Sequence, residues 1–424
     1  MPSILKSRER GAIFLLILMF SQTTFSSGQI EKVIHSFTLS TSDGNQPMGA
    51  LVADKAGNLY GTASLGGSSP NCSFSGCGIV FELSPQADGG WIETIIHNFQ
   101  GGPSDAALPD SLVCDKVGNL YGTSPLVIFE LSPPAAPGGV WTETVLFQFP
   151  ADGSLGSLAS GKLIFDGLGN LYGTTYEGGE IGTNAGTVFQ LKAPAAPGGS
   201  WTHRILYNFG GFPGDGNNPS RGALAFRKGV LYGTTEWGGA YQAGTFFRLV
   251  QKNGVWREEI LHNFKGSPDG GQPLGDLIFD DAGNVYGTTF FGGTTFCIRG
   301  CGTIYKIFQP AGPGDPWREV VLYRFRSKGD GNHPWAGLIH DKAGNLYGTA
   351  SGENFGGPSG VVFRLKPPTV SGGTWTETPL HHFAGQPDDG SYPEAEPILL
   401  NGALYGTTQL GGTANWGAVF SLIP

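Results

Sequence analysis

The stretch from Asp166 to Leu191, DGLGNLYGTTYEGGEIGTNAGTVFQL, decides the fold because each of its phrases recurs along the chain. Its centre, Leu-Tyr-Gly-Thr or once Val-Tyr-Gly-Thr, occurs seven times, with the tyrosines at positions 60, 121, 172, 232, 286, 347 and 405. These tyrosines are 51 to 61 residues apart. That period fits one four-stranded propeller blade with long loops, as in kelch repeats.

Each repeat contains four short segments with β character. The first two are joined at the phrase Asp-x-x-Gly-Asn, whose residues favour a tight turn. The third has the pattern of Val188 to Leu191. The fourth runs from a tryptophan to a phenylalanine eight residues later, and starts at Trp91, Trp141, Trp201, Trp256, Trp317 and Trp375.

The two ends of the repeat array complement each other. The segment from Ile30 to Phe37 is a fourth strand without its repeat, and the last repeat ends at a third strand, Val419 to Leu422. Pairing these two would complete a ring and leave no blade unfinished. We therefore predict an all-β, seven-bladed β-propeller with four antiparallel strands per blade, closed by the N-terminal strand.

Two smaller expectations follow from the same repeat. The glycine of Tyr-Gly-Thr should let a neighbouring blade approach the inner strands. The fourth strand should present one edge to water, and charge is a common protection for such an edge. We assign that role to Glu31, Glu93, Glu143, Glu258, Glu319 and Glu377, with His203 in the remaining copy.

Composition excludes several classes of protein. The chain of 424 residues has 71 glycines and 29 prolines, which argues against a long helical fold. Aromatic residues make up 12 %, far more than in disordered chains. The net charge is -9, and no run of basic residues occurs beyond the extreme N-terminus. Nucleic acid is therefore not expected as a partner.

The N-terminus has the layout of a secretory signal. Lys6, Arg8 and Arg10 precede an apolar run from Ala12 to Phe20, and small residues follow. We predict a signal peptide over residues 1–28 and a single propeller domain over 29–424. No later apolar run is long enough to span a membrane. The mature protein is expected to be a secreted or periplasmic monomer without a cofactor.

The repeat resembles that of the GloVer tandem-repeat family of secreted bacterial proteins. Units of that family also read D-x-x-G-N-L-Y-G-T-T-x-x-G-G, G-T-V-F-x-L and W-x-E-x-x-L-x-x-F, in this order, and the similarity here extends from Gln29 onward. The resemblance implies an extracellular propeller of the kelch or NHL type. It transfers no catalytic residues to this chain.

The loops before the first strand and between the second and third strands should emerge on one face, which we call the loop face. Aromatic residues presented there suit stacking on sugars or anchoring a protein, although they also suit packing over the blades. The candidates for ligand binding are Tyr176, Glu177, Trp237, Tyr241, Phe291, His333, Trp335, Glu353, Tyr392 and Trp416.

Most of these loops also carry an Asp-Gly pair. Such an aspartate commonly caps its own turn, and a ring of them is a weaker candidate for a site that binds a hard cation. The residues concerned are Asp43, Asp215, Asp269, Asp330 and Asp389. In an exported chain we expect two local disulfides, Cys72 with Cys77 and Cys297 with Cys301. Cys114 should be a buried free thiol.

The histidines at positions 35, 97, 262 and 381 share one repeat position with Phe147, Tyr207 and Tyr323, so this position requires a ring and not a proton carrier. No known catalytic motif is present. The leading hypothesis is a non-enzymatic module that binds an extracellular glycan or surface protein. A polysaccharide hydrolase or lyase and a structural envelope component remain as alternatives. The second-to-third-strand loop of blade two is very short, which predicts a notch there.

Overall fold

The computed structural model describes residues 31–38, 43–72, 76–102, 105–136, 138–180, 183–196, 198–211, 213–219, 221–222, 224–352, 359–370 and 372–424. These ranges contain strands and turns and no helix. No candidate membrane-spanning helix is found in them. The predicted signal peptide and Glu353 lie outside the described residues.

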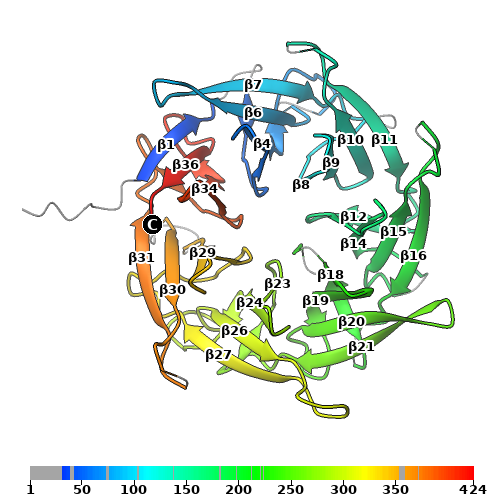
Figure 1. Cartoon of the computed structure of the whole chain (residues 1–424), viewed down its shortest axis with the longest axis vertical. Coiled ribbons are helices and arrows are strands. Elements are labelled where there is room, and N and C mark those ends of the chain that lie inside the picture. Colours follow the sequence, from blue (N-terminus) through cyan, green and yellow to red (C-terminus); the bar gives the residue numbers. More distant parts are fainter. Residues whose placement is uncertain are drawn as a thin grey trace, which may run out of the picture.

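Seven antiparallel sheets stand around a central axis like the blades of a propeller (Figure 1). From the axis outward, blades one to four consist of β3 (Val52–Ala53), β4 (Leu59–Ala63), β6 (Ile79–Pro85) and β7 (Trp91–Asn98); β8 (Leu112–Cys114), β9 (Leu120–Thr123), β10 (Val127–Ser132) and β11 (Thr142–Gln148); β13 (Ile164–Phe165), β14 (Leu171–Glu177), β15 (Thr187–Lys192) and β16 (Thr202–Asn208); and β18 (Ala225–Arg227), β19 (Val230–Gly238), β20 (Thr245–Lys252) and β21 (Val255–Asn263).

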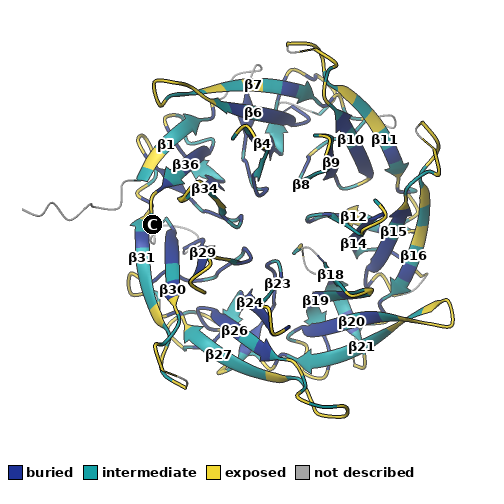
Figure 2. Cartoon of the chain, in the orientation of Figure 1, coloured by how far each residue is buried: buried dark blue, intermediate teal, exposed yellow. Residues whose placement is uncertain are grey.

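Blades five to seven continue the same order. They consist of β23 (Ile278–Phe279), β24 (Val285–Thr289), β26 (Thr303–Phe308) and β27 (Arg318–Arg324); β28 (Ile339–His340), β29 (Leu346–Ala350), β30 (Val361–Lys366) and β31 (Thr376–His382); and β33 (Ile398–Leu400), β34 (Ala403–Thr408), β36 (Ala418–Leu422) and β1 (Glu31–Ser36). In Figure 2 the inner and third strands are largely buried, and the outermost strands and the turns at the periphery carry most of the exposed residues.

A short extra ladder crosses the loop face of five blades. In each ladder the loop before the first strand pairs with the start of the loop after the second strand. The pairs are β2 (Gly44–Asn45) with β5 (Leu65–Gly66), β12 (Ser157–Ala159) with the end of β14, β17 (Gly216–Pro219) with the end of β19, β22 (Gly270–Gly271) with β25 (Phe291–Gly292), and β32 (Gly390–Ser391) with β35 (Leu410–Gly411). These ladders fix where the loop residues lie.

The ring closes as the sequence predicts. β1 pairs antiparallel with β36, with Glu31 opposite Leu422 and Ser36 opposite Ala418. The backbone N–H of Phe37 then donates to the carbonyl of Gly417 at 3.0 Å. Figure 1 shows β1 beside β36 on the outer edge of the last blade. The predicted seven-bladed fold and its closing strand are thus confirmed.

The phrase Asp-x-x-Gly-Asn-Leu-Tyr is explained by one hydrogen-bond set. In blade three the Asp166 carboxylate accepts bonds from the backbone N–H of Leu168 and Asn170, from the Asn170 amide at 2.7 Å and from the Tyr172 hydroxyl at 3.0 Å. Gly169 has a φ of 85°, which costs little only for glycine. Burial opposes the effect, but these bonds hold the pKa of Asp166 below its ordinary value.

The glycine of Tyr-Gly-Thr has a different function from the one expected. A Cβ on Gly173 would lie 2.6 Å from Cζ of Phe189 and 2.8 Å from a methyl group of Leu163, both in the same blade. The ring of the third strand therefore fills the space above the glycine. The expectation that this space admits a neighbouring blade is wrong, because the blade's own phenylalanine occupies it.

Aromatic pairs join each blade to the next. The phenylalanine that ends the fourth strand meets the aromatic residue in the middle of the next blade's third strand, with ring centroids 4.9 to 5.6 Å apart. At the closure the pair is Phe37 and Phe81, 5.2 Å apart. Such pairs add about 0.5–1.5 kcal/mol each beyond the burial of their area. The repeated Trp-to-Phe phrase therefore holds the ring together.

Candidate functional site

A ring of left-handed residues forms the inner rim of the loop face. One residue in every blade, just before its first strand, has a φ between 49° and 57°. In six blades proline follows it. The backbone N–H of this residue generally bonds to a loop of the preceding blade, as from Asn218 to the Ala185 carbonyl at 2.9 Å. The seven rim residues are Gln46, Leu108, Leu158, Asn218, Gln272, His333 and Tyr392.

The side chains that follow the rim residue differ in every blade. They come two positions later, or three in blade four, and all line the opening at the axis. They are Met48, Asp110, Ser160, Arg221, Leu274, Trp335 and Glu394. A repeated backbone thus presents an apolar, acidic, basic or aromatic group depending on the blade. We call the opening that they surround the central cavity.

The floor of the central cavity is charged. Lys162 of blade three reaches across the axis to Glu396 of blade seven, with Nζ 3.3 Å from Oε1. The nearby carboxylate of Glu396 raises the pKa of Lys162 although burial opposes this. Asp276 of blade five acts on it in the same direction. The axial channel is narrow where these groups meet, about 50 Å³ in volume.

Above the floor the cavity widens to about 460 Å³. Two predicted residues meet in its wall, Tyr176 and Trp335. The Tyr176 hydroxyl donates to Oε2 of Glu236 at 2.8 Å, and the guanidinium of Arg221 lies 5.9 Å from the Trp335 ring centre. Burial raises the pKa of Glu236. Aromatic faces and hydrogen-bonding groups therefore share one wall.

Glu394 supplies a titratable group beside this wall. Burial raises its pKa to about 7, the carboxylate of Asp110 adds to the rise, and the Arg221 guanidinium counteracts it. A carboxyl group with such a pKa is half-protonated near neutral pH. It can therefore accept or donate a hydrogen bond to a ligand.

The short loop of blade two forms one side of the central cavity. Ser124 N–H bonds to the carbonyl of Val127 at 2.8 Å, so the chain turns back at once into β10. Pro125 at this turn lines the cavity, together with Leu108 and Leu158 of the rim. The predicted notch therefore forms part of the cavity wall.

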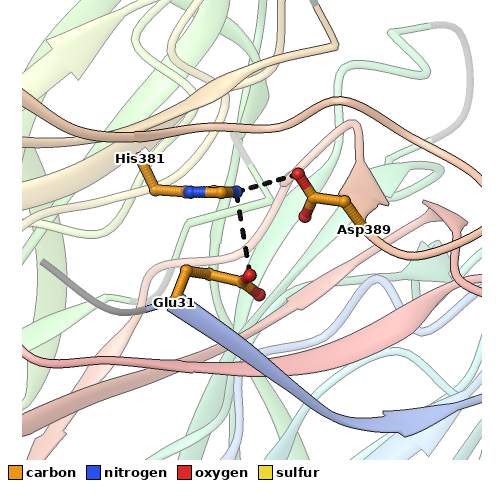
Figure 3. Close-up of side chains that lie close together, drawn as sticks. All are labelled: Glu31, His381 and Asp389. Carbon is orange, nitrogen blue, oxygen red and sulfur yellow. Dashed lines mark hydrogen bonds and ion pairs between the residues drawn. The ribbon is translucent and has the colours of Figure 1, made fainter.

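The Asp-Gly residues lie elsewhere, between the blades. At the ring closure the His381 Nε2 is 2.9 Å from Oδ2 of Asp389 and 3.9 Å from Oε2 of Glu31 (Figure 3). Asp389 also accepts the backbone N–H of Ala384 and Gly390, at 2.7 and 2.6 Å. We call this arrangement of a ring, the loop aspartate and the next blade's glutamate an interblade clasp.

Four of the clasps bring a histidine nitrogen and two carboxylates within 4.8 Å of one another. Zn²⁺ also binds such donors. In two other clasps, however, tyrosine takes the place of histidine, and its hydroxyl donates to the aspartate. Tyr207 bonds to Asp215 at 2.9 Å and Tyr323 to Asp330 at 2.7 Å. The shared feature is therefore a ring that faces the aspartate; it hydrogen-bonds to the aspartate in these two clasps and at His381, and we do not propose a metal there.

The clasp overturns our expectation for the glutamates of the fourth strand. The Glu93 and Glu319 side chains are only 15 % and 9 % exposed, and both face a histidine of the neighbouring blade. Burial, opposed by His35 and reinforced by Asp43, raises the pKa of Glu93 to about 7. These groups do not protect an open edge, because they are buried between blades.

The junction of blades two and three departs from this pattern. Phe147 takes the ring position and stacks on His203 at 4.1 Å with an angle of 8° between the rings. Burial lowers the pKa of His203 to about 4, so this histidine is neutral. The loop aspartate Asp152 is exposed and bonds to Ser154 instead. At this junction the Phe147 ring has no hydrogen-bond donor, and its stacking on His203 takes the place of a hydrogen bond to the aspartate.

The remaining predicted ligand residues do not line the central cavity. Trp237 and Phe291 line a second, smaller pocket. Tyr241 is exposed. Trp416 packs against the core between blades seven and one. The other three are part of the loop framework: Glu177 pairs with Ser157, the His333 ring stacks on Phe290, and the backbone of Tyr392 bonds to Ser359 and Gln409.

Sequence reasoning missed Arg221, Glu236, Glu394 and Lys162. These residues belong to no recognisable sequence motif, and each is found in only one of the seven repeats. A signal was present for Glu394, however: where proline follows the rim residue, the residue after that proline changes its chemical class from one blade to the next, whereas Arg221 lies one position further along the chain. In a repeat whose other positions are fixed by packing, such variation points to a surface that does not serve the fold.

The cysteines are arranged largely as predicted. Cys72 is bonded to Cys77 and Cys297 to Cys301, each within one loop. Both disulfide predictions are confirmed. Cys114 is free, but it is half-buried rather than buried, because it lies near the end of β8 where the chain turns. Burial raises the pKa of its thiol.

Solved structures of low sequence identity share the fold. Virginiamycin B lyase from Staphylococcus aureus superposes with a TM-score of 0.53 at 14 % identity, and the alignment covers 93 % of this chain and 99 % of that one. A candidate 6-phosphogluconolactonase from Bacteroides uniformis gives 0.50 at 14 % identity, with coverages of 81 % and 89 %. A comparison with curated protein sequences finds no significant match.

A family model matches most of the chain directly. The model of the Gloeobacter/Verrucomicrobia repeat matches residues 126–314 and 220–424. Together these ranges include blades three to six in full and three of the four strands of blade seven, β33, β34 and β36. The chain therefore belongs to the Gloeobacter/Verrucomicrobia repeat family.

Proposed function

We propose that this protein is a secreted, non-catalytic propeller that binds an extracellular glycan in the central cavity. The observation that carries the proposal is the inner rim, where a constant backbone presents seven different side chains around one opening. The cavity of about 460 Å³ lies within the range of small-ligand sites. A protein partner generally needs a broader contact surface.

The chemistry of the wall suits a sugar ring. Tyr176 and Trp335 offer apolar faces to the C–H groups of a pyranose, and such rings also carry polar handles. The carboxylates of Glu236 and Asp110 accept hydrogen bonds from hydroxyl groups, and the guanidinium of Arg221 donates them. The short turn at Pro125 provides the side on which a longer glycan would leave the cavity.

Secretion is part of the same proposal. The two disulfides are compatible with an oxidising compartment outside the cytoplasm. The signal-like segment at residues 1–28 supports it from the sequence.

A polysaccharide hydrolase or lyase is the second candidate, and one observation favours it. Glu394, with a pKa of about 7, lies beside Arg221 in the cavity and could act as a general acid or base. This role predicts turnover of a bound glycan that Glu394→Gln abolishes. The binding role predicts no products at all.

A glycan array probed with the purified protein, followed by product analysis of every hit, tests the proposal. We expect binding without cleavage. Trp335→Ala should remove it, whereas Tyr241→Ala, which truncates an exposed aromatic outside the cavity, should leave it unchanged. Cleavage products, or equal loss of binding in both variants, would contradict the proposed function.

A further inference from the structure

A second pocket lies on the loop face between blades four and five, apart from the central cavity. It has a volume of about 220 Å³ and is lined by Trp237 at the end of β19, Phe291 of β25, the amides of Gln242 and Gln272, and Arg299. Arg299 belongs to the loop that the disulfide between Cys297 and Cys301 closes. We call this space the Arg299 pocket.

The Arg299 guanidinium is stacked between two rings. It lies 4.5 Å from the ring centre of Phe291 and 5.3 Å from that of Trp237. The loop backbone is also held, since the Gly292 N–H bonds to the Arg299 carbonyl at 2.9 Å. Among the described residues the guanidinium has no carboxylate partner and no hydrogen bond. Its donor groups are therefore positioned and available for an anion.

The surroundings of the pocket are basic, although the protein carries a net charge of -9. In the loop segments 236–244, 265–276, 290–302 and 324–336, every exposed charged side chain is a lysine or arginine, and the acidic side chains there are half-buried or buried. Two of the lysines also lie over aromatic rings, Lys265 over Tyr241 at 5.9 Å and Lys328 over Phe296 at 4.2 Å. The exposed basic residues are Lys265, Arg299, Arg324, Arg326 and Lys328.

We propose that the Arg299 pocket binds the carboxylate of an acidic sugar within a polyanionic glycan. The planar guanidinium matches a carboxylate in two parallel hydrogen bonds. The rings of Trp237 and Phe291 hold the guanidinium in place for the carboxylate, and the amides of Gln242 and Gln272 can bond to the hydroxyl groups of the sugar. The other basic residues attract the rest of the charged chain.

The pocket adjoins the central cavity through two links. Glu236 of the cavity wall immediately precedes Trp237, and the Gln272 amide donates to Oε1 of Glu236 at 3.2 Å. A single-stranded nucleic acid also binds basic, aromatic surfaces, but it needs a series of stacking platforms along a groove. One pocket the size of a single ring favours a sugar. The inference goes beyond the proposed function and does not depend on it.

Isothermal titration of the purified protein with polygalacturonate tests the inference, with fully methyl-esterified polygalacturonate as the uncharged counterpart. We expect binding of the acidic polymer only. Arg299→Ala should weaken it at least about tenfold, the usual effect of losing a charge-assisted hydrogen bond. Arg299→Lys keeps the charge without the planar fork and should lose part of the affinity.

Lys192→Ala is the matched control, because it removes an exposed basic residue at the far end of β15. Should Arg299→Ala disturb the disulfide loop, the double variant Lys265→Ala/Lys328→Ala reports on the same surface without touching that loop. The inference is overturned if esterified and acidic polymers bind equally, if Lys192→Ala weakens binding as much as Arg299→Ala, or if poly-uridine binds more tightly than polygalacturonate. Loss of neutral-glycan binding in Trp335→Ala alone bears on the proposed function only.

Discussion

The interblade clasps and the inner rim are built by the same repeat, yet they use it in opposite ways. At six of the seven blade junctions the clasp is built from similar groups: a histidine or tyrosine ring, a loop aspartate and a glutamate of the next blade. At the rim, the backbone recurs with a φ near 50° in all seven blades, and the side chains after it differ in charge and size.

The difference reflects what each region contacts. A clasp residue is half-buried or buried between two blades, so its partners in the neighbouring blade limit what can replace it. The side chains that follow the rim residues line the opening on the axis, where the blades allow different groups, although the Asp110 carboxylate also accepts the backbone N–H of Gly161 in the next blade at 2.9 Å. The repeat therefore determines the clasps through packing, and leaves the rim available for a ligand.

The largest expected effect comes from replacing the side chain that follows a rim residue by the side chain at the same position of another blade. Leu274 occupies in blade five the position of Trp335 in blade six. Trp335→Leu should therefore keep the thermal midpoint of unfolding, and should weaken glycan binding at least about tenfold, because truncated aromatic anchors have the largest costs. Binding by titration and melting by calorimetry check both parts. Unchanged affinity would contradict the claim that the variable side chains around the opening bind the glycan.

Breaking a clasp should have the opposite result. Tyr323→Phe removes the hydroxyl that bonds to Asp330 at 2.7 Å and leaves a buried carboxylate with one partner fewer. We expect a loss of about 1–3 kcal/mol in unfolding free energy with unchanged glycan affinity. Tyr323→His introduces the ring that bonds to Asp389 in the clasp of His381, so it is the control and should lose less. Denaturant titration measures both variants, and equal losses would contradict the hydrogen-bond account.

An intermediate effect is expected from filling the notch. Replacing the turn at residues 124–126 with the blade-three loop, residues 178–186, should block one side of the central cavity. Affinity for a glycan found on the array should fall severalfold, and affinity for its monosaccharide should change less. If the long and short ligands are affected alike, the notch does not serve as the exit for a chain.

The smallest expected effect is a change in the pH dependence of stability. Burial and the charge of Asp330 raise the pKa of Glu377 to about 8 from an ordinary value of 4.5. Between these two pH values the folded protein holds a proton on Glu377 that the unfolded chain has released. The free energy of unfolding therefore decreases as pH rises through this range. Glu377→Gln should raise the melting temperature at pH 8 by about 1–2 °C relative to the wild type, and change it less at pH 5. A larger gain at pH 5 would contradict this sign.

The sequence determined the architecture almost completely, because the phrases around Tyr172 and Phe189 report contacts that every blade repeats. The pairing of Glu31 with Leu422 could be predicted for the same reason. The glutamates were misassigned, since a strand pattern does not show that Glu93 faces His35 of another blade. Tyr176 and Trp335 were found as loop aromatics. Arg221 and Glu394 were not, because only the ring brings their blades together around one cavity.

The most direct test of the account is a crystal structure of the protein soaked with a glycan identified on the array. We predict density for a sugar ring in the central cavity, in contact with Tyr176 and Trp335, and no ligand at the clasps. Sugar density confined to the outer face of the ring or to a clasp such as that of His381, Asp389 and Glu31, with the central cavity empty, would contradict it.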